Sequence, residues 1–247
     1  MPHVINIDLW FWRLDARAED VARWRGYLDA AEIGRMERFV FARDQVRYTI
    51  CRSRMRRILG FYTRTSPRDI TFATEGRDKP VLAGANPRRL TFNLTHTDGL
   101  ACLAVTKGEP VGVDLERIRT VEDDFIVYAL NPAEHTLLPE DPALRGPAFF
   151  RYWTAKEAYL KAIGTGLWQS LKTFDVEVPI DTAKDTFTRC ALPRIDDDAE
   201  RARNWHLLTF LATDQHPGAV AIAPPAGSTL DIRTRWIATP GDGNLDQ

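Results

Sequence analysis

Hydrophobic and polar positions along the chain repeat with two periods, the alternation typical of strands and the three- to four-residue spacing typical of helices. Alternating or continuously apolar runs predict strands at the following segments: 5–12, 70–74, 90–96, 100–105, 111–116, 173–178, 205–211 and 218–223. Helical spacing predicts helices at the following segments: 18–28, 29–39, 43–62, 121–138 and 149–163. Asp29 is a predicted N-cap, and Gly60 and Gly164 are predicted to end their helices.

The two halves of the chain share one order of elements, a long helix followed by three strands. Their third strands are also similar, TDGLACLAV against HPGAVAIA. This similarity predicts an α+β fold of two similar α/β subdomains in a pseudo-twofold arrangement, with any ligand site in the cleft between them. We place the subdomains at residues 1–110 and 111–227. From residue 228 onward the periodicity is lost, which predicts a C-terminal tail at 228–247 whose last residues, TPGDGNLDQ (239–247), are frayed.

The composition is that of a globular protein, because 44% of the 247 residues are hydrophobic and 27% are charged. No apolar run approaches membrane-spanning length, and Asp8 and Asp15 interrupt any signal-peptide pattern. Cys51, Cys102 and Cys190 are odd in number and widely spaced in apolar surroundings, which predicts buried free thiols rather than disulfides or a zinc site. We therefore expect a cytoplasmic protein that spans no membrane.

The net charge of −1 hides a basic segment, since ten arginines and only two acids lie between Arg35 and Arg68. Such a segment is either a solvated helix face or a site for phosphates, nucleic acid or an acidic protein surface. Charge alone does not decide between these interpretations.

Two acids in the segment VGVDLE share one face of a predicted strand. Residues two apart in a strand point the same way, so Asp114 and Glu116 lie with Gly112 on the face opposite Val111 and Val113. The two acids either face water on the outer side of an edge strand or line a cleft in which a hard cation balances their charge.

The helix predicted at 149–163 carries Trp153, Glu157 and Lys161 on one stripe, at four-residue intervals. Glu157 and Lys161 can form a helical ion pair, which stabilises a helix by only a few tenths of a kcal/mol. Alternatively, they can face the acids of 111–116. Three acids and a lysine are what a divalent metal holding a phosphate ester would need.

A histidine at the end of a predicted strand, His96, lies between Thr95 and Thr97 just before a turn. This group can hold a phosphate through charge-assisted hydrogen bonds, or the threonines can simply cap the turn. In the turn GRDKP (76–80), Lys79 can reach an anion or remain in solvent.

The segment VGVDLE followed by WTAKEAYLKAIGTGL resembles the paired signature of the 4′-phosphopantetheinyl transferases. The resemblance is to their large monomeric type, typified by the enzyme that activates surfactin synthetase. Three further family features occur in order: the arginine-bearing helix DQVRYTICRSRMRRIL, the turn GRDKP and the stretch NLTH. The resemblance spans residues 34–166.

The resemblance implies an enzyme that transfers the 4′-phosphopantetheine arm of coenzyme A to a serine of a carrier protein and releases adenosine 3′,5′-bisphosphate. Carried over by position, it assigns Mg²⁺, or Mn²⁺ in its place, to Asp114, Glu116 and Glu157. It assigns coenzyme A, in the cleft between the subdomains, to the following residues: Arg35, Arg47, Lys79, Pro80, Thr95, His96, Asp114 and Lys161.

The catalytic residues implied by the resemblance are Glu157, Lys161 and Asp114. Phosphoryl transfer depends mostly on positioning and charge stabilisation, and Glu157, or a water that it holds, is our choice for removing the serine proton. The implied partner is an apo acyl carrier protein or a peptidyl carrier protein domain. We expect a monomer that binds neither nucleic acid nor a membrane.

The sequence departs from the family pattern at two places. Thr95 and Thr97 flank the histidine where serines are common, and Glu32 stands where a basic residue is common. Two other functions remain open from the residues themselves: a metal-dependent nuclease or phosphohydrolase, and a binding module for an acidic protein or RNA whose acids are merely solvated.

Overall fold

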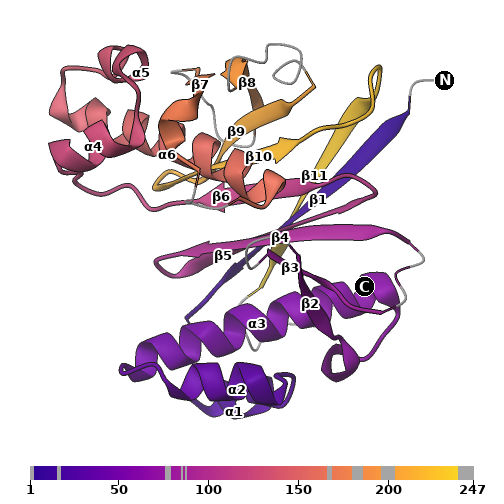
Figure 1. Ribbon diagram of the computed structural model, residues 1–247. Coiled ribbons are helices and arrows are strands. Elements are labelled where there is room, and N and C mark those ends of the chain that lie inside the picture. The colour runs from indigo at the N-terminus through magenta and orange to yellow at the C-terminus, as the bar shows by residue number, and fades with distance from the viewer. Residues whose placement is uncertain are drawn as a thin grey trace.

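The fold is α+β, as predicted, and has four layers, with two sheets packed face to face between two layers of helices (Figure 1). The computed structural model describes the following residues: 3–15, 18–75, 79–84, 86, 88–165, 169–179, 186–195 and 204–238. Gly166, the last residue of the segment that carries the resemblance, and residues 76–78 of the turn before Lys79 lie outside this description.

Both halves of the chain contribute helices and strands. The first half forms, in order, β1 Val4–Arg13, α1 Ala18–Arg25, α2 Ala30–Glu37, α3 Ala42–Thr63, β2 Phe72–Glu75, β3 Lys79–Leu82, β4 Leu90–Thr97 and β5 Leu100–Lys107. The second half forms β6 Val111–Leu115, α4 Asp123–Ala129, α5 Pro132–Thr136, α6 Pro142–Ile163, β7 Phe174–Glu177, β8 Thr188–Ile195, β9 His206–Thr213, β10 His216–Ile222 and β11 Thr229–Ile237. The sheets have the strand orders β11-β1-β5-β4 and β6-β10-β9-β8-β7, and β2 pairs with β3 separately.

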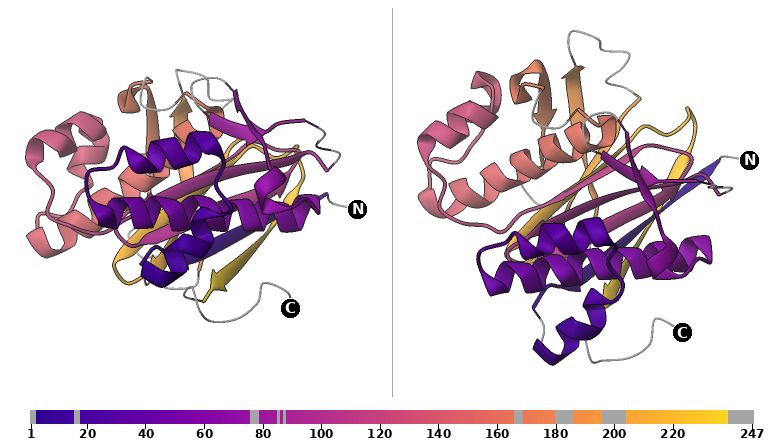
Figure 2. Two further views of the ribbon diagram at one scale, coloured as in Figure 1. Left: turned by 90° about the horizontal axis from the view of Figure 1, so that it is seen from below. Right: turned by 60° about the horizontal axis from the view of Figure 1, so that its bottom comes forward.

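Each contact between layers has its own apolar core. Trp12 and Ile50 belong to the cluster between the first sheet and α3, while Phe149 belongs to the cluster between α6 and the second sheet. A third cluster, which includes Ile7 and Val113, lies between the two sheets. Figure 2 shows α1–α3 lying across the outer face of the first sheet. This stacking leaves β4 and β6, the edge strands of the two sheets, side by side.

The predicted helices and strands are mostly confirmed, although β3, β8 and β11 were not predicted. The differences in helix bounds follow from local capping. The helix predicted at 121–138 is two helices, because Asn131 forms a capping box with Glu134 and Pro132 begins α5. The helix predicted at 149–163 begins earlier, at Pro142, with Asp141 as its N-cap. Gly164 ends it in the left-handed conformation, as predicted.

Gly60 does not end α3, so that prediction is wrong. The helix continues to Thr63, and Arg64 takes the left-handed cap position. Gly60 is needed for a different reason, because a Cβ there would lie 2.6 Å from the carbonyl oxygen of Thr65, where the chain folds back against the helix.

The tail predicted at 228–247 is wrong for Thr229–Ile237, which form β11. This strand pairs in parallel with β1, from Val4 opposite Thr229 to Trp12 opposite Ile237. Its alternation is present, with Leu230 and Ile232 packed on the core between the sheets, but the intervening charged residues dilute it. Residues 239–247 lie outside the described part of the chain.

All three cysteines are buried and form no disulfide, as predicted for Cys51, Cys102 and Cys190. Among the described residues, none of the helices combines the length and the apolar character that crossing a membrane would require.

Candidate active site

The seam between β4 and β6 is closed by side chains rather than by a backbone ladder. The side-chain oxygen of Asn93 accepts a hydrogen bond from the Val113 N–H at 2.8 Å. Further along both strands, Thr95 donates to Asp114 at 3.0 Å, and Thr97 donates to Glu116 at 3.3 Å. The seam therefore places the threonines beside His96 directly against the two acids of β6.

The strand-face prediction is confirmed for β6. Val111, Val113 and Leu115 enter the core between the sheets, whereas Gly112 lies directly against the backbone of α6. Asp114, on the same face as Gly112, is only 4% exposed. The alternative in which it is solvated on the outer side of an edge strand is therefore wrong.

Lys161 bonds to β6 and β4 rather than simply decorating its own helix. Its Nζ atom donates to Asp114 Oδ1 at 2.5 Å and to Thr95 Oγ1 at 3.2 Å. The close approach of α6 to Gly112 makes these contacts geometrically accessible. Lys161 therefore pairs with Asp114 of β6 instead of forming the helical pair with Glu157 that periodicity alone would suggest.

Glu157 belongs to the same helix, four residues before Lys161, and is 8% exposed. Burial first, and then the charge of Asp114, raise the pKa of its carboxyl group to about 7, against the opposite effect of Lys161. Glu157 Oε1 and Asp114 Oδ2 are both buried without a hydrogen-bond partner. Two uncompensated carboxylate oxygens in one buried region are costly unless a further group binds them.

Glu116 differs from the other two acids because its side chain is partly exposed and pairs with an arginine. Its Oε2 atom accepts from Thr97 and, at 2.9 Å, from Nη1 of Arg119. Its side chain is 22% exposed. Glu116 is therefore the acid that can most easily change partners.

The three acids fit a hard divalent cation in the chemistry of their donors, since Mg²⁺ and Ca²⁺ bind carboxylate oxygens. The unpartnered oxygens of Asp114 and Glu157 are the observation that favours such a site. Within the part of the chain that the structure describes, no three histidine, cysteine or acidic side chains are yet close enough to hold an ion. In this conformation, Lys161 and Arg119 balance the charges of Asp114 and Glu116 instead.

Next to this cluster, a pocket of about 330 Å³ is lined by Arg47, Tyr48, His96, Thr97 and other residues of α3 and the β4 end. His96 is exposed at its mouth, yet the protein atoms around the ring, and then the charge of Lys161, lower its pKa. Its imidazole is therefore neutral at pH 7, able to donate one hydrogen bond and accept another.

Arg47 is held by two acids that sequence reasoning missed. It donates to Asp98 at 2.6 Å and pairs with Asp15 at 3.3 Å. Burial opposes the charged form, but these two acids outweigh it and raise the pKa of Arg47. Asp98 also pairs with Arg117, which follows β6, and so links the two halves of the chain. The feature of the sequence that could have identified Asp98 is its position beside Gly99 in a predicted turn.

Of the remaining predicted site residues, Arg35 lies near this pocket, whereas Lys79 and Pro80 lie elsewhere. Arg35 is exposed with its guanidinium 5.9 Å from the ring of Tyr48, near the mouth of the pocket. Lys79 lies at the other end of β6, where it donates to the carbonyl oxygens of Val111 and Ala162. Pro80 is paired with Thr74 in the β2–β3 hairpin. The structure thus does not gather all the predicted residues into one pocket.

The basic segment is largely structural in its middle. Arg56 is fully buried and binds Glu32 at 2.6 Å, and Arg52 binds the other oxygen of Glu32. Glu32 is also the N3 residue of the capping box that begins α2. Glu32, which stands where the family often has a basic residue, therefore supports the packing of α2 on α3 and does not lie at the rim of a phosphate site.

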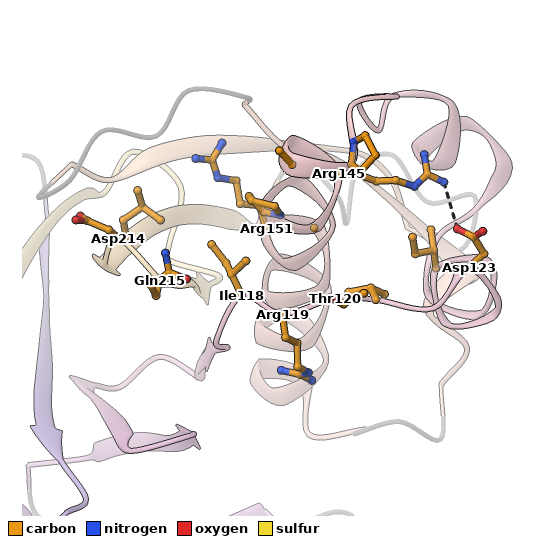
Figure 3. Close-up of a pocket in the computed structure, with 15 residues that line it drawn as sticks. Ile118, Arg119, Thr120, Asp123, Arg145, Arg151, Asp214 and Gln215 are labelled. Carbon is orange, nitrogen blue, oxygen red and sulfur yellow. Dashed lines mark ion pairs between the residues drawn. The ribbon is translucent and has the colours of Figure 1, made fainter.

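A second pocket, of about 590 Å³, is lined by residues that follow Glu116 along the chain, beginning at Ile118. Figure 3 shows it between the segment that follows β6, the first turns of α6 and the turn after β9. Arg119, Arg145 and Arg151 supply positive charge around it, and Arg145 pairs with Asp123 at 3.8 Å.

Comparison with known proteins gives matches along most of the chain. Residues 110–221 match the model of the 4′-phosphopantetheinyl transferase superfamily, and residues 15–108 match that of the 4′-phosphopantetheinyl transferase N-terminal region. The chain is 33% identical to 4′-phosphopantetheinyl transferase HetI of Nostoc sp. over 88% of both chains. It is 26% identical to the mouse L-aminoadipate-semialdehyde dehydrogenase-phosphopantetheinyl transferase, over 95% of this chain and 78% of the relative. It is 32% identical to 4′-phosphopantetheinyl transferase psf-1 of Bacillus pumilus, over 59% and 61%.

Proposed function

The chain belongs to the 4′-phosphopantetheinyl transferase superfamily, and we propose that its transfer reaction depends on Mg²⁺ held by Asp114, Glu116 and Glu157. As an enzyme of this class, it transfers the 4′-phosphopantetheine arm of coenzyme A to a serine of a carrier protein and releases adenosine 3′,5′-bisphosphate. The observation that carries the metal proposal is the pair of buried, unpartnered oxygens on Asp114 and Glu157.

A bound Mg²⁺, or Mn²⁺ in its place, would neutralise charge on the pyrophosphate of coenzyme A. Lys161 is suited to the same task, because its Nζ already lies 2.5 Å from Asp114 and can exchange that carboxylate for a phosphate oxygen. Thr95 holds the other side of Lys161 and so limits where its ammonium group can move.

Glu157 is our proposed acceptor of the serine proton, directly or through a water. A general base works best when its pKa lies near the working pH, and burial raises the pKa of Glu157 to about 7. A bound cation would lower that basicity, so relay through a water is compatible with the same site. Asp114 would position Lys161, with which it is already paired.

We further propose that the cleft between two subdomains, 1–110 and 111–227, binds coenzyme A. Its phosphates would be bound by Arg47, Thr95 and His96, with Arg35 at the rim. Arg47 is already charged and only partly exposed, but an anion must compete with Asp98 and Asp15 for it.

For Lys79 and Pro80 the proposal is a contact with the adenosine end of coenzyme A. Lys79 is held by backbone carbonyl oxygens, and its burial lowers its pKa. A phosphate would be a better acceptor than either neutral carbonyl, which favours exchange when the ligand binds.

The family implies a carrier protein and coenzyme A as partners. More finely, we propose an apo acyl carrier protein or peptidyl carrier protein domain as the acceptor, and a cytoplasmic monomer that acts without nucleic acid or membrane. The burial of Arg56 and the engagement of Arg52 remove much of the basis for a nucleic-acid site in the arginine-rich helix.

Incubation with coenzyme A, Mg²⁺ and a panel of apo carrier proteins should add about 340 Da to a carrier, measured by mass spectrometry. Asp114→Asn and Glu157→Gln should each abolish this transfer, whereas Glu177→Gln, a matched change of an exposed carboxylate, should not. Full transfer in EDTA, or by either site variant, would contradict the proposed metal site.

A further inference from the structure

The acid at the rim of the candidate metal site has a counter-ion of its own. Glu116 pairs with Arg119 at 2.9 Å, three residues further along the chain. Asp114 and Glu157 each keep a buried oxygen without a partner, whereas Oε2 of Glu116 accepts from both Thr97 and Arg119. A cation that Glu116 binds through Oε2 together with these two acids therefore competes with Arg119 for that oxygen.

The pair formed by Glu116 and Arg119 is one that a cation can readily displace. The Arg119 side chain is 55% exposed, and its Nη1 atom also donates to the carbonyl oxygen of Arg117 at 3.2 Å. Solvent-exposed ion pairs contribute little to stability, whereas carboxylates bind a hard divalent cation directly. A cation that also satisfies Asp114 and Glu157 therefore has the advantage over Arg119 for Glu116.

Arg119 has a place to go when it is displaced. Its guanidinium lies 4.7 Å from the ring of Phe150, a buried residue of α6, and this stacking does not depend on Glu116. Arg119 also borders the 590 Å³ pocket, where Figure 3 shows its side chain pointing away from Arg145 and Arg151. The contact with Phe150 therefore remains available to the guanidinium when its pair with Glu116 is lost.

We propose that Arg119 is an exchangeable counter-ion, a positioning residue that holds Glu116 at the rim of the site and yields it when a divalent cation binds. This inference rests on the proposed metal site. It makes Arg119 a determinant of how tightly the enzyme binds its cation, because the guanidinium both competes for Glu116 and adds positive charge near the ion.

Mn²⁺ binding to the full-length protein without coenzyme A, followed by electron paramagnetic resonance of the free ion, tests the proposal. Arg119→Gln should tighten Mn²⁺ binding by about two- to fivefold, the range expected for loss of an exposed ion pair. Arg119→Lys, which keeps the charge, should lie close to wild type. Arg145→Gln is the matched control, because Arg145 borders the same pocket but pairs with Asp123.

Unchanged or weaker Mn²⁺ binding by Arg119→Gln would overturn the proposal, and so would an equal gain in Arg145→Gln, which would indicate a general charge effect. The proposed metal site fails separately, if Asp114→Asn binds Mn²⁺ as the wild type does. The concentration of Mg²⁺ that gives half-maximal transfer should fall in Arg119→Gln by the same factor as the Mn²⁺ dissociation constant.

Discussion

A Cβ atom on Gly112 would stand 2.0 Å from the backbone oxygen of Ala158, so β6 and α6 meet backbone to backbone. A glycine on the face of the strand that packs against α6 is what allows the helix to come this close. The same approach brings Lys161 to Asp114. Packing and site geometry therefore depend on one residue without a side chain.

We predict that Gly112→Ala lowers the free energy of unfolding by roughly 1–3 kcal/mol or more, because α6 must move away from β6. Transfer activity should also fall under conditions in which the variant is fully folded, since Lys161 moves with the helix. Urea denaturation and a transfer assay well below the unfolding midpoint check both effects. Gly34→Ala is the control, because a Cβ at this position in α2 meets nothing within 4 Å. That variant should be more stable by roughly 0.5–1 kcal/mol, and equal losses in both variants would contradict the argument.

The pKa of Glu157 predicts a pH dependence of stability. Because burial and the charge of Asp114 raise this pKa from 4.5 to about 7, the folded protein binds more protons than the unfolded chain between these values. The free energy of unfolding should therefore fall as pH rises through this range, by at most about 3 kcal/mol in the absence of divalent cations.

Urea denaturation in EDTA at about pH 5 and about pH 8 measures this loss. Glu157→Gln should remove most of it, while Glu177→Gln, an exposed acid, should keep the wild-type slope. Added Mg²⁺ should stabilise the wild type more than Glu157→Gln at the higher pH. Parallel pH profiles for wild type and Glu157→Gln would show that Glu157 is not the group responsible.

Replacement of Arg47 should selectively raise the KM for coenzyme A. If it binds the 3′-phosphate, Arg47→Ala should raise the KM for coenzyme A by about 10-fold or more, the loss expected for a hydrogen bond to a charged group. The KM for 3′-dephospho-coenzyme A should change much less, because that analogue lacks the phosphate. Arg43→Ala, on the same helix but with a 70% exposed side chain, is the control. An equal rise for both substrates would assign Arg47 another role.

Replacement of Glu32 should lower the free energy of unfolding, although Glu32 takes no direct part in the transfer reaction. Glu32→Gln removes the charge that balances Arg56, whose side chain is 0% exposed, and should destabilise the protein by roughly 3–5 kcal/mol. Glu37→Gln breaks the exposed pair with Arg25 and should change stability by less than about 1 kcal/mol. Thermal or urea unfolding distinguishes the two. Similar small changes in both variants would mean that Arg56 finds compensation elsewhere, such as Asp29.

Local patterns in the sequence predicted what depends on neighbours along the chain. The two-residue period of a strand placed Asp114 opposite Val113, and the helical period aligned Glu157 with Lys161. Residues whose position depends on tertiary packing were beyond such reasoning. Asp98 meets Arg47 only because the β4–β5 turn folds against α3, and Lys79 reaches Val111 and Ala162 only because the β2–β3 hairpin lies at that end of the seam.

The strand β11 was missed for a related reason. Its charged residues face outward, and nothing in its own sequence indicates a parallel pairing with β1, more than 200 residues earlier. Similarly, charge density could not separate Arg56, which is buried, from arginines on the same helix that face solvent.

The pairing of β11 with β1 also restricts how the molecule can move. The last strand leaves β10 in the second sheet and returns to the first, where the Thr229 N–H donates to the carbonyl oxygen of His3 at 2.9 Å. The two sheets are therefore tied together by the chain at the β5–β6 connection and again at β10–β11. A hinge that opens like a book would have to peel β11 from its neighbour. We therefore expect substrates to enter and leave with rearrangement of side chains along the β4–β6 seam rather than with separation of the sheets.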